Sequence, residues 1–322
     1  ILNAYDLAFN GDGSRLYLVD GFGDSVIAEY ALSTPFDVET MSYASHYRFN
    51  WPAASGDRWK ISFNGDGSKL YILPSELGTI RAYDLSTNYD VSTAVYNGES
   101  FSVSSQSATS TDLTFNDDGS KLYVIDSLGN DAYAYNLSTN YDISSASYSG
   151  ETLDIGTTAR PTGLTFNDDG TELVILGGFA TVGADNFHVY SLSTPYLLTS
   201  ASYDGRYDAS SNLPNTGAGL TFNDDGSKIY TIDFGGGRSV IAFDVSTAFD
   251  VLAGTSHSGE ESFLPVRVNP DGFAFGDSGN KLYTTGFNTS DDTVFTFQLS
   301  SAYDLNSAEI IETEAYNTNS ED

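Results

Sequence analysis

Short runs of alternating apolar and polar residues recur along the whole chain, with turn-forming residues between them. Leu113-Thr114-Phe115 places apolar side chains two positions apart, and Leu122-Tyr123-Val124-Ile125-Asp126 is rich in β-branched and aromatic residues. Both patterns are typical of β-strands. Between them, Asn116-Asp117-Asp118-Gly119 combines residues that favour a tight turn. The pattern therefore predicts a β-hairpin, and no segment shows a sustained helical period.

This hairpin opens a repeat of about fifty residues. A Phe ends the first strand of each of six repeats, and consecutive Phe residues are 54, 52, 51, 56 and 53 residues apart. A third strand such as 132–135 and a fourth such as 146–151 complete each unit. Six units of four antiparallel strands predict an all-β fold, a six-bladed β-propeller. The six anchor residues are Phe9, Phe63, Phe115, Phe166, Phe222 and Phe275.

The length of the chain fits one domain built from these repeats. We expect a single propeller domain over residues 1–322, with residues 317–322 as an acidic C-terminal tail. The composition is 40% hydrophobic and 14% aromatic, which is ample for a packed core. We expect the last blade to take its fourth strand from its own C-terminal segment, at about 305–316, without an N-terminal strand closing the ring.

The net charge of the chain limits the kinds of partner that it can bind. Thirteen Lys and Arg stand against 44 Asp and Glu, which gives a formal net charge of −31. Such a surface repels phosphate backbones and anionic membranes, and the apolar runs are only strand-length. The sequence therefore predicts no nucleic-acid partner and no membrane insertion, and it suits an extracellular, salt-rich setting. The absence of Cys excludes disulfides and thiol chemistry.

The repeat resembles a known family at one phrase. Residues 115–124, Phe-Asn-Asp-Asp-Gly-Ser-Lys-Leu-Tyr-Val, are similar to the repeat of YVTN-type propellers, which include surface-layer and lactonase-like proteins. Each unit is longer than in that family, because it carries an extra segment such as 138–148. This extended repeat resembles those of secreted and virion-surface proteins of marine bacteria and their phages. The resemblance implies the architecture more firmly than any activity.

Several motifs that suggest chemistry have a structural explanation in the repeat. The Asp-rich turns have the wrong spacing for an EF-hand loop, so we expect plain turns. Gly276-Asp277-Ser278-Gly279 resembles the phrase around a serine-protease nucleophile, but it aligns with the hairpin turn 116–119. His46, His188 and His257 lie in different repeats, which argues against a zinc site. No cofactor follows from the sequence, although weak calcium binding between carboxylates stays open.

The mouth of the central channel is the expected place for a ligand, where first strands begin and second strands end. Three residues before the anchor Phe, some repeats carry a charged residue and others Gly, and several second strands end in Asp. These groups could bind a metal ion or polar ligand, or they could bond to neighbouring blades. The candidate ligand or metal residues are Asp6, Asp20, Lys60, Asp112, Asp126 and Asp233.

Two tryptophans form a second candidate. Trp51 and Trp59 flank a stretch rich in Pro, Ala and Gly, and their rings could stack on a sugar. The alternative is that they pack between blades.

Two functions follow from these observations. The first is a non-enzymatic structural or adhesion protein of a cell or virion surface, which binds a glycan, a protein or copies of itself through a rigid propeller. The second is a metal-dependent, lactonase-like hydrolase, in which carboxylates at the channel mouth hold a cation that polarises an ester carbonyl. The sequence favours the first and assigns no catalytic residue.

Overall fold

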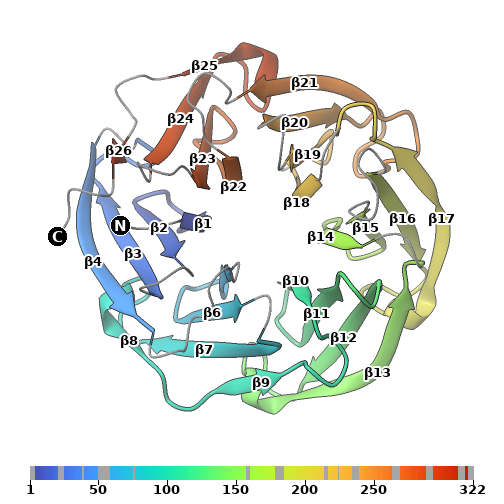
Figure 1. Ribbon diagram of the computed structural model, residues 1–322, viewed down its shortest axis with the longest axis horizontal. Coiled ribbons are helices and arrows are strands. Elements are labelled where there is room, and N and C mark those ends of the chain that lie inside the picture. The colour runs from blue at the N-terminus through green and yellow to red at the C-terminus, as the bar shows by residue number, and fades with distance from the viewer. Residues whose placement is uncertain are drawn as a thin grey trace. The chain divides into compact units, whose positions relative to one another are not determined.

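The computed structural model is a six-bladed β-propeller with four antiparallel strands in each blade, as the repeat predicts (Figure 1). The chain divides into two compact units, and the prediction of one domain over residues 1–322 stays a prediction. Unit 1 comprises Ile1–Glu76, Ile80–Glu99 and Phe263–Asp322, and unit 2 comprises Leu77–Thr79 and Ser100–Ser262. The structure describes residues 4–20, 25–37, 40–49, 59–74, 77–156, 160–177, 185–213, 217–223, 225–233, 239–262, 269–287, 293–310 and 316–317.

Unit 1 holds the first, second and sixth blades. Within it, the first strand of blade 1 packs against the first strands of blades 2 and 6. Its strands are β1 (Ala4–Phe9), β2 (Arg15–Asp20), β3 (Val26–Leu32), β4 (Met41–Arg48), β5 (Trp59–Phe63), β6 (Lys69–Pro74), β7 (Thr79–Leu85), β8 (Ala94–Val95), β22 (Asn269–Gly276), β23 (Lys281–Phe287), β24 (Thr293–Leu299), β25 (Ala308–Ile310) and β26 (Tyr316–Asn317), with the 3₁₀ turns η2 (Val91–Thr93) and η6 (Leu305–Ser307).

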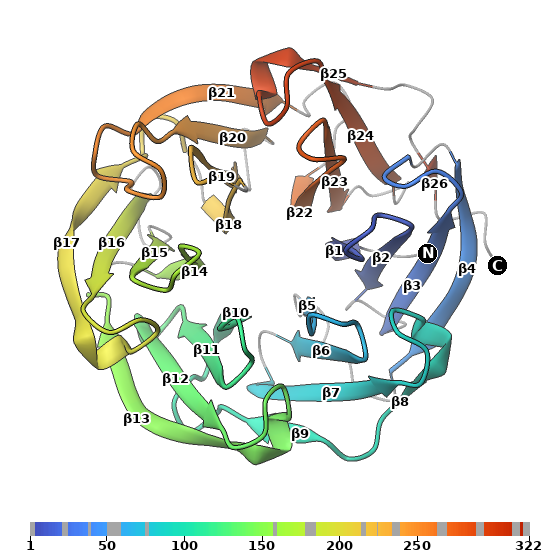
Figure 2. The ribbon, with the colours of Figure 1, turned by 180° about the vertical axis from the view of Figure 1, so that it is seen from behind.

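Unit 2 holds the third, fourth and fifth blades, each with its strands in chain order from the inner to the outer edge (Figure 2). The strands of these blades are β10 (Ser110–Phe115), β11 (Lys121–Asp126), β12 (Asp131–Leu137), β13 (Ala146–Asp154), β14 (Pro161–Phe166), β15 (Glu172–Gly177), β16 (Asn186–Leu192), β17 (Ala201–Asp208), β18 (Gly217–Phe222), β19 (Lys228–Asp233), β20 (Ser239–Asp244) and β21 (Ser256–Ser262), with the 3₁₀ turns η3 (Ile143–Ser145) and η4 (Leu198–Ser200). The residues of unit 2 also include the short strand β9 (Ser100–Ser102), which is not part of these three sheets.

The hairpin turns are held by their own side chains, as the turn interpretation expects. In blade 3, the side-chain carbonyl of Asn116 accepts the backbone N–H of Lys121 at 2.8 Å. One Asp118 carboxylate oxygen accepts the N–H of Ser120 at 2.8 Å and the Asn116 amide at 2.9 Å. The Ser120 bonds lower the pKa of Asp118 below its ordinary value. These carboxylates therefore close turns.

The extra segment of each repeat forms a loop that folds back on this turn. In blade 3, the N–H of Tyr141 bonds to the carbonyl of Gly119 at 2.8 Å, and the Tyr141 ring lies directly over Gly119. A Cβ on Gly119 would lie 2.3 Å from that ring, and its φ is 70°. Asp142 then caps η3 by accepting the N–H of Ser144. The Gly is required both by the turn and by the ring above it.

The sixth blade takes its fourth strand from the C-terminal segment, as predicted. β25 pairs with β24 through Leu299 and Ala308, and β26 pairs with the same strand through Val294 and Tyr316. The N-terminal strand β1 is instead the innermost strand of blade 1.

Apolar residues from adjacent blades form the core. Between blades 3 and 4, Tyr123 and Ile125 of β11 pack with Leu164 of β14 and with Leu173 and Ile175 of β15. These side chains alternate along each strand, so one face of a blade meets the facing side of the next. The core therefore lies between blades, and a blade is held mainly by its neighbours.

Candidate functional site on the inner strands

Asp6 and Lys60 occupy the same register of β1 and β5 and lie together in unit 1. The Lys60 ammonium is 3.8 Å from one Asp6 oxygen, and the other oxygen accepts the N–H of Ile61 at 3.1 Å. Burial raises the pKa of Asp6 above its ordinary value, although Lys60 opposes this shift. The carboxylate thus joins blade 1 to the backbone of blade 2.

Asp112 does the same in unit 2. Its carboxylate accepts the N–H of Leu113 at 3.0 Å in its own strand and the N–H of Leu164 at 3.3 Å in the next blade. Leu164 stands in the register that Ile61 has in blade 2, two residues before the anchor Phe. The two aspartates are therefore equivalent groups that link the innermost strands of consecutive blades.

The glycines of this register mark a second way to join inner strands. A Cβ on Gly163 would lie 3.0 Å from the backbone carbon of Gly219 in the next blade. A Cβ on Gly272 would likewise lie 3.1 Å from the Cα of Asp6. At these two junctions a side chain would require the neighbouring backbone to shift by a few tenths of an ångström. Gly at this register therefore allows the close approach of the inner strands.

Asp126 is buried at the end of β11 and organises a loop. Its two carboxylate oxygens accept the Thr109 hydroxyl at 2.6 Å, the N–H of Leu128 at 3.0 Å and the N–H of Ala108 at 3.2 Å. With three donors, this carboxylate is satisfied as a structural group.

The remaining candidates are only partly described. Asp20 and Asp233 end β2 and β19 and pair with Ala4 and Gly217 through the backbone, but their side chains lie outside the described residues. Trp51 also lies outside them. Trp59 begins β5 and is buried, with its ring centroid 5.5 Å from that of Phe49. Its ring therefore packs in the core of unit 1.

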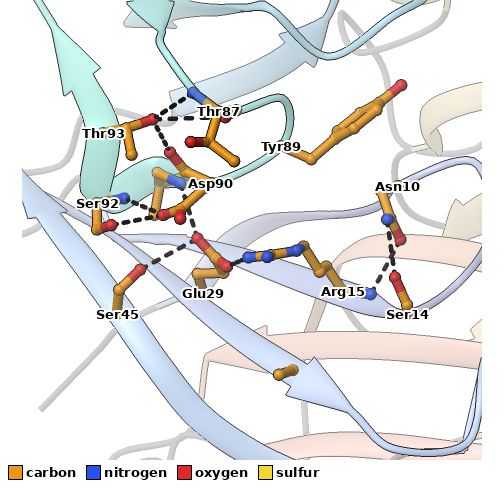
Figure 3. A network of polar contacts seen from close by, with 12 residues as sticks. Asn10, Ser14, Arg15, Glu29, Ser45, Thr87, Tyr89, Asp90, Ser92 and Thr93 are labelled. Carbon is orange, nitrogen blue, oxygen red and sulfur yellow. Dashed lines mark hydrogen bonds and ion pairs between the residues drawn. The ribbon is translucent and has the colours of Figure 1, made fainter.

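Sequence reasoning missed a polar clasp between blades 1 and 2. The buried Glu29 of β3 forms an ion pair with Arg15 at the start of β2 and accepts the Ser45 hydroxyl at 3.1 Å (Figure 3). The same carboxylate accepts the N–H of Val91, the first residue of η2 in blade 2, at 2.7 Å. The buried charge is thus paired and fully bonded, as a stable ion pair requires.

Blades 3 and 4 have an equivalent clasp. Lys121, six residues after its anchor Phe like Arg15, lies 2.6 Å from Glu151 of β13. Glu151 accepts the N–H of Leu198, the first residue of η4 in blade 4, at 2.8 Å. The carboxylate comes from different strands in the two clasps, so spacing along the sequence does not reveal it. The charged residue at the start of each second strand was the available signal.

An aromatic stack accompanies each clasp. The anchor Phe166 lies between Tyr123 of the preceding blade and Tyr196 of its own loop, with ring centroids 4.8 and 5.1 Å away. The Tyr123 hydroxyl donates to the carbonyl of Tyr196, and burial raises the pKa of Tyr123. The same stack joins Tyr17 to Phe63, and Tyr283 to Phe9. The anchor Phe is therefore a residue of the blade junction.

Within the ranges given above, no group of three or more His, Asp or Glu side chains is arranged to hold a metal ion. In the same part of the chain, no helix has the length and apolar character to cross a membrane.

Comparison with known proteins identifies the fold. No family model and no curated protein matches the sequence. Solved structures do match: a candidate 6-phosphogluconolactonase from Bacteroides fragilis shares 13% identity with a TM-score of 0.64, covering 98% of this chain and 84% of that one. The periplasmic gluconolactonase PpgL of Pseudomonas aeruginosa shares 15% identity with a TM-score of 0.63, covering 95% and 83%. The Cps50 (Swd1) propeller domain of Myceliophteria thermophila shares 11% with a TM-score of 0.57, covering 97% and 86%.

Proposed function

We propose that this chain is a non-enzymatic binding or structural protein of a cell or virion surface, which uses the propeller as a rigid platform. The observation that carries the proposal is the use of the inner carboxylates. Asp6, Asp112 and Asp126 each accept backbone N–H groups of a neighbouring blade or loop. Groups engaged in this way stabilise the scaffold and are poorly placed to bind a substrate.

The charge of the chain supports the surface setting. A formal charge of −31 gives strong self-repulsion that salt screens, so such a protein works best at high ionic strength. Clasps and aromatic stacks fix blade 1 to blade 2 and blade 3 to blade 4, which suits a protein whose role is to present a surface. The partner is a glycan, a protein or a second copy of the chain.

The alternative function, suggested by similarity of fold, is a lactonase-like hydrolase. Two of the similar structures are described as lactonases, but at 13% and 15% identity the likeness extends to the fold alone. An ester hydrolase of this kind would need a cation or an acid–base pair on the inner strands.

The test is to assay the purified chain against glucono-1,5-lactone and 6-phosphogluconolactone, with calcium and with a chelator. We expect hydrolysis no faster than in buffer. Sedimentation and glycan-array binding across a salt series should reveal association that depends on ionic strength. Calcium-dependent turnover would overturn the proposal, as would indifference of all association to salt and calcium.

A further inference from the structure

In the outer part of blade 2, an arginine side chain lies over the ring of an exposed tyrosine. Arg81 of β7 places its guanidinium 5.1 Å from the centre of the Tyr96 ring, just after β8. Tyr96 is 37% exposed, so this contact lies at the surface. An arginine over an aromatic face is attracted by the negative charge density of the ring. The chain thus uses this position of a blade to hold a guanidinium group.

Blade 3 has two tyrosines at the corresponding positions. Tyr133 stands two residues before Tyr135, as Arg81 stands two before Tyr83, and Tyr148 follows Ala146 by two, as Tyr96 follows Ala94. The Tyr133 and Tyr148 ring centroids are 6.3 Å apart in an edge-on arrangement. Tyr148 is 39% exposed. Blade 3 therefore presents a pair of rings where blade 2 has a ring and its own cation.

Two carboxylates extend this pair of rings along the same face. The Tyr133 hydroxyl donates to Asp131 at 3.0 Å, and Asp131 stands directly opposite Asp154 in the ladder between β12 and β13. Like charges opposite each other destabilise a sheet. Partial burial, together with the nearby carboxylates of Asp154 and Asp126, raises the pKa of Asp131. No described Lys or Arg forms an ion pair with Asp131 or Asp154.

We propose that this surface, the blade 3 rim formed by Tyr133, Tyr148, Asp131 and Asp154, binds an arginine side chain of a basic partner polypeptide. The guanidinium stacks on a tyrosine ring and pairs with the carboxylates, which suits its flat shape and its charge. The partner is complementary in sign to a chain with 44 acidic and 13 basic residues. The proposal goes beyond the proposed function, because it names the partner and the surface and holds even if the inner strands prove catalytic.

Blade 4 provides a matched control within the same unit. Tyr203 takes the place of Tyr148 and is 53% exposed. Its neighbours are His188 and Arg206, which face each other across β16 and β17. Burial and the Arg206 charge lower the pKa of His188. Asn186 faces Asp208 where blade 3 has Asp131 facing Asp154, so blade 4 lacks both the second tyrosine ring and the pair of facing carboxylates. An exposed tyrosine alone should therefore contribute little to the binding of a cationic partner.

The experiment measures binding of a fluorescein-labelled nona-arginine peptide to the full chain by fluorescence anisotropy at physiological ionic strength. We expect Tyr148→Leu and Asp154→Asn each to weaken binding roughly 2- to 5-fold, the range of an exposed cation–π contact or ion pair. Tyr148→Phe should retain binding, because it keeps the ring. Tyr203→Leu should bind as the wild type does. Thermal unfolding of each variant shows that the changes leave the fold intact.

Other outcomes would overturn the proposal. Equal binding by wild type, Tyr148→Leu and Asp154→Asn would show only the diffuse attraction of an acidic protein. Nona-lysine that binds as tightly as nona-arginine, with the same response to the variants, would contradict recognition of guanidinium. Loss of binding in Tyr203→Leu would place the contact on another blade. Lactone hydrolysis is measured separately, so failure here is distinct from failure of the proposed function.

Discussion

Two neighbouring blade junctions are held by different groups. One joins blades 3 and 4, and the other joins blades 4 and 5. At the first, Lys121 pairs with Glu151, which accepts the N–H of Leu198. At the second, Glu172 stands in the register of Lys121, and its own carboxylate accepts the N–H of Val251. Both junctions thus bind the second residue after the loop aromatic of the next blade through a carboxylate, but among the described residues only the first junction pairs that carboxylate with a cation.

The junction between blades 4 and 5 has apolar contacts where the junction between blades 3 and 4 has an ion pair. Val174 takes the place of Tyr123, so no tyrosine hydroxyl reaches the next loop from this position. Phe187 takes the place of Ala132 and contacts Phe243 of blade 5 with ring centroids 5.1 Å apart. Tyr207 packs against both rings. The repeat therefore fixes the geometry of a junction and leaves its chemistry free to change.

The largest effect should follow from removing the ring that only the second junction has. Phe187 is fully buried, so Phe187→Ala leaves a cavity and should lower the free energy of unfolding by about 3–5 kcal/mol. Urea denaturation measures this. A loss below about 1 kcal/mol would show that the aromatic cluster does not hold blades 4 and 5 together.

At the junction between blades 3 and 4, the largest loss of unfolding free energy should follow from removing the carboxylate of Glu151. Glu151→Ala leaves the Leu198 N–H without its acceptor and the Lys121 ammonium with only the Tyr196 carbonyl, and we expect a loss of about 3 kcal/mol. Glu151→Gln keeps an acceptor for the backbone and should cost less. Equal losses for the two variants would mean that the ion pair, rather than the backbone bond, carries the effect.

The difference in charge should appear as a difference in pH dependence. Burial and the nearby Asp250 and Asp204 carboxylates raise the pKa of Glu172 to about 7, and among the described residues its Oε1 atom has no hydrogen-bond donor. A pKa that is higher in the folded than in the unfolded chain gives stability that is present below about pH 4.5 and is lost as pH rises through about 7.

Relative to Glu172→Gln, the wild type should therefore lose about 1–2 kcal/mol of stability between pH 4.5 and 8. This is less than the full shift implies, because solvent screens a partly exposed carboxylate. Urea denaturation of both proteins across this range measures the difference. A difference that stays constant with pH would show that folding does not raise the pKa of Glu172.

The smallest effect should come from the tyrosine that the second junction lacks. Tyr123→Phe removes the hydrogen bond to the Tyr196 carbonyl but keeps the ring against Phe166, so we expect a loss of about 1 kcal/mol. Thermal unfolding detects a change of this size. Tyr133→Phe, which removes a hydroxyl that bonds only to a partly exposed carboxylate, serves as the comparison and should cost less.

The sequence predicted the parts of this fold that local pattern controls. The hairpin 113–126 combines a period of two with a turn that its own side chains close, so strand and turn positions followed from the residues alone. The clasps could not be predicted, because Glu29 and Glu151 reach the next blade from different strands. The sequence marked Asp112 as a candidate ligand but could not show that its carboxylate accepts the N–H of Leu164 in the next blade, and its role in binding stays a prediction.

The central claim is that the inner carboxylates hold blades together rather than perform chemistry. The most direct test compares wild type with Asp112→Asn, with unfolding free energy and lactone hydrolysis measured on the same preparations. We predict a loss of about 1–2 kcal/mol, because Asn has one acceptor oxygen where the two oxygens of Asp112 accept the N–H groups of Leu113 and Leu164. We predict no hydrolysis by either protein. Hydrolysis by the wild type that Asp112→Asn abolishes, at unchanged stability, would contradict the account.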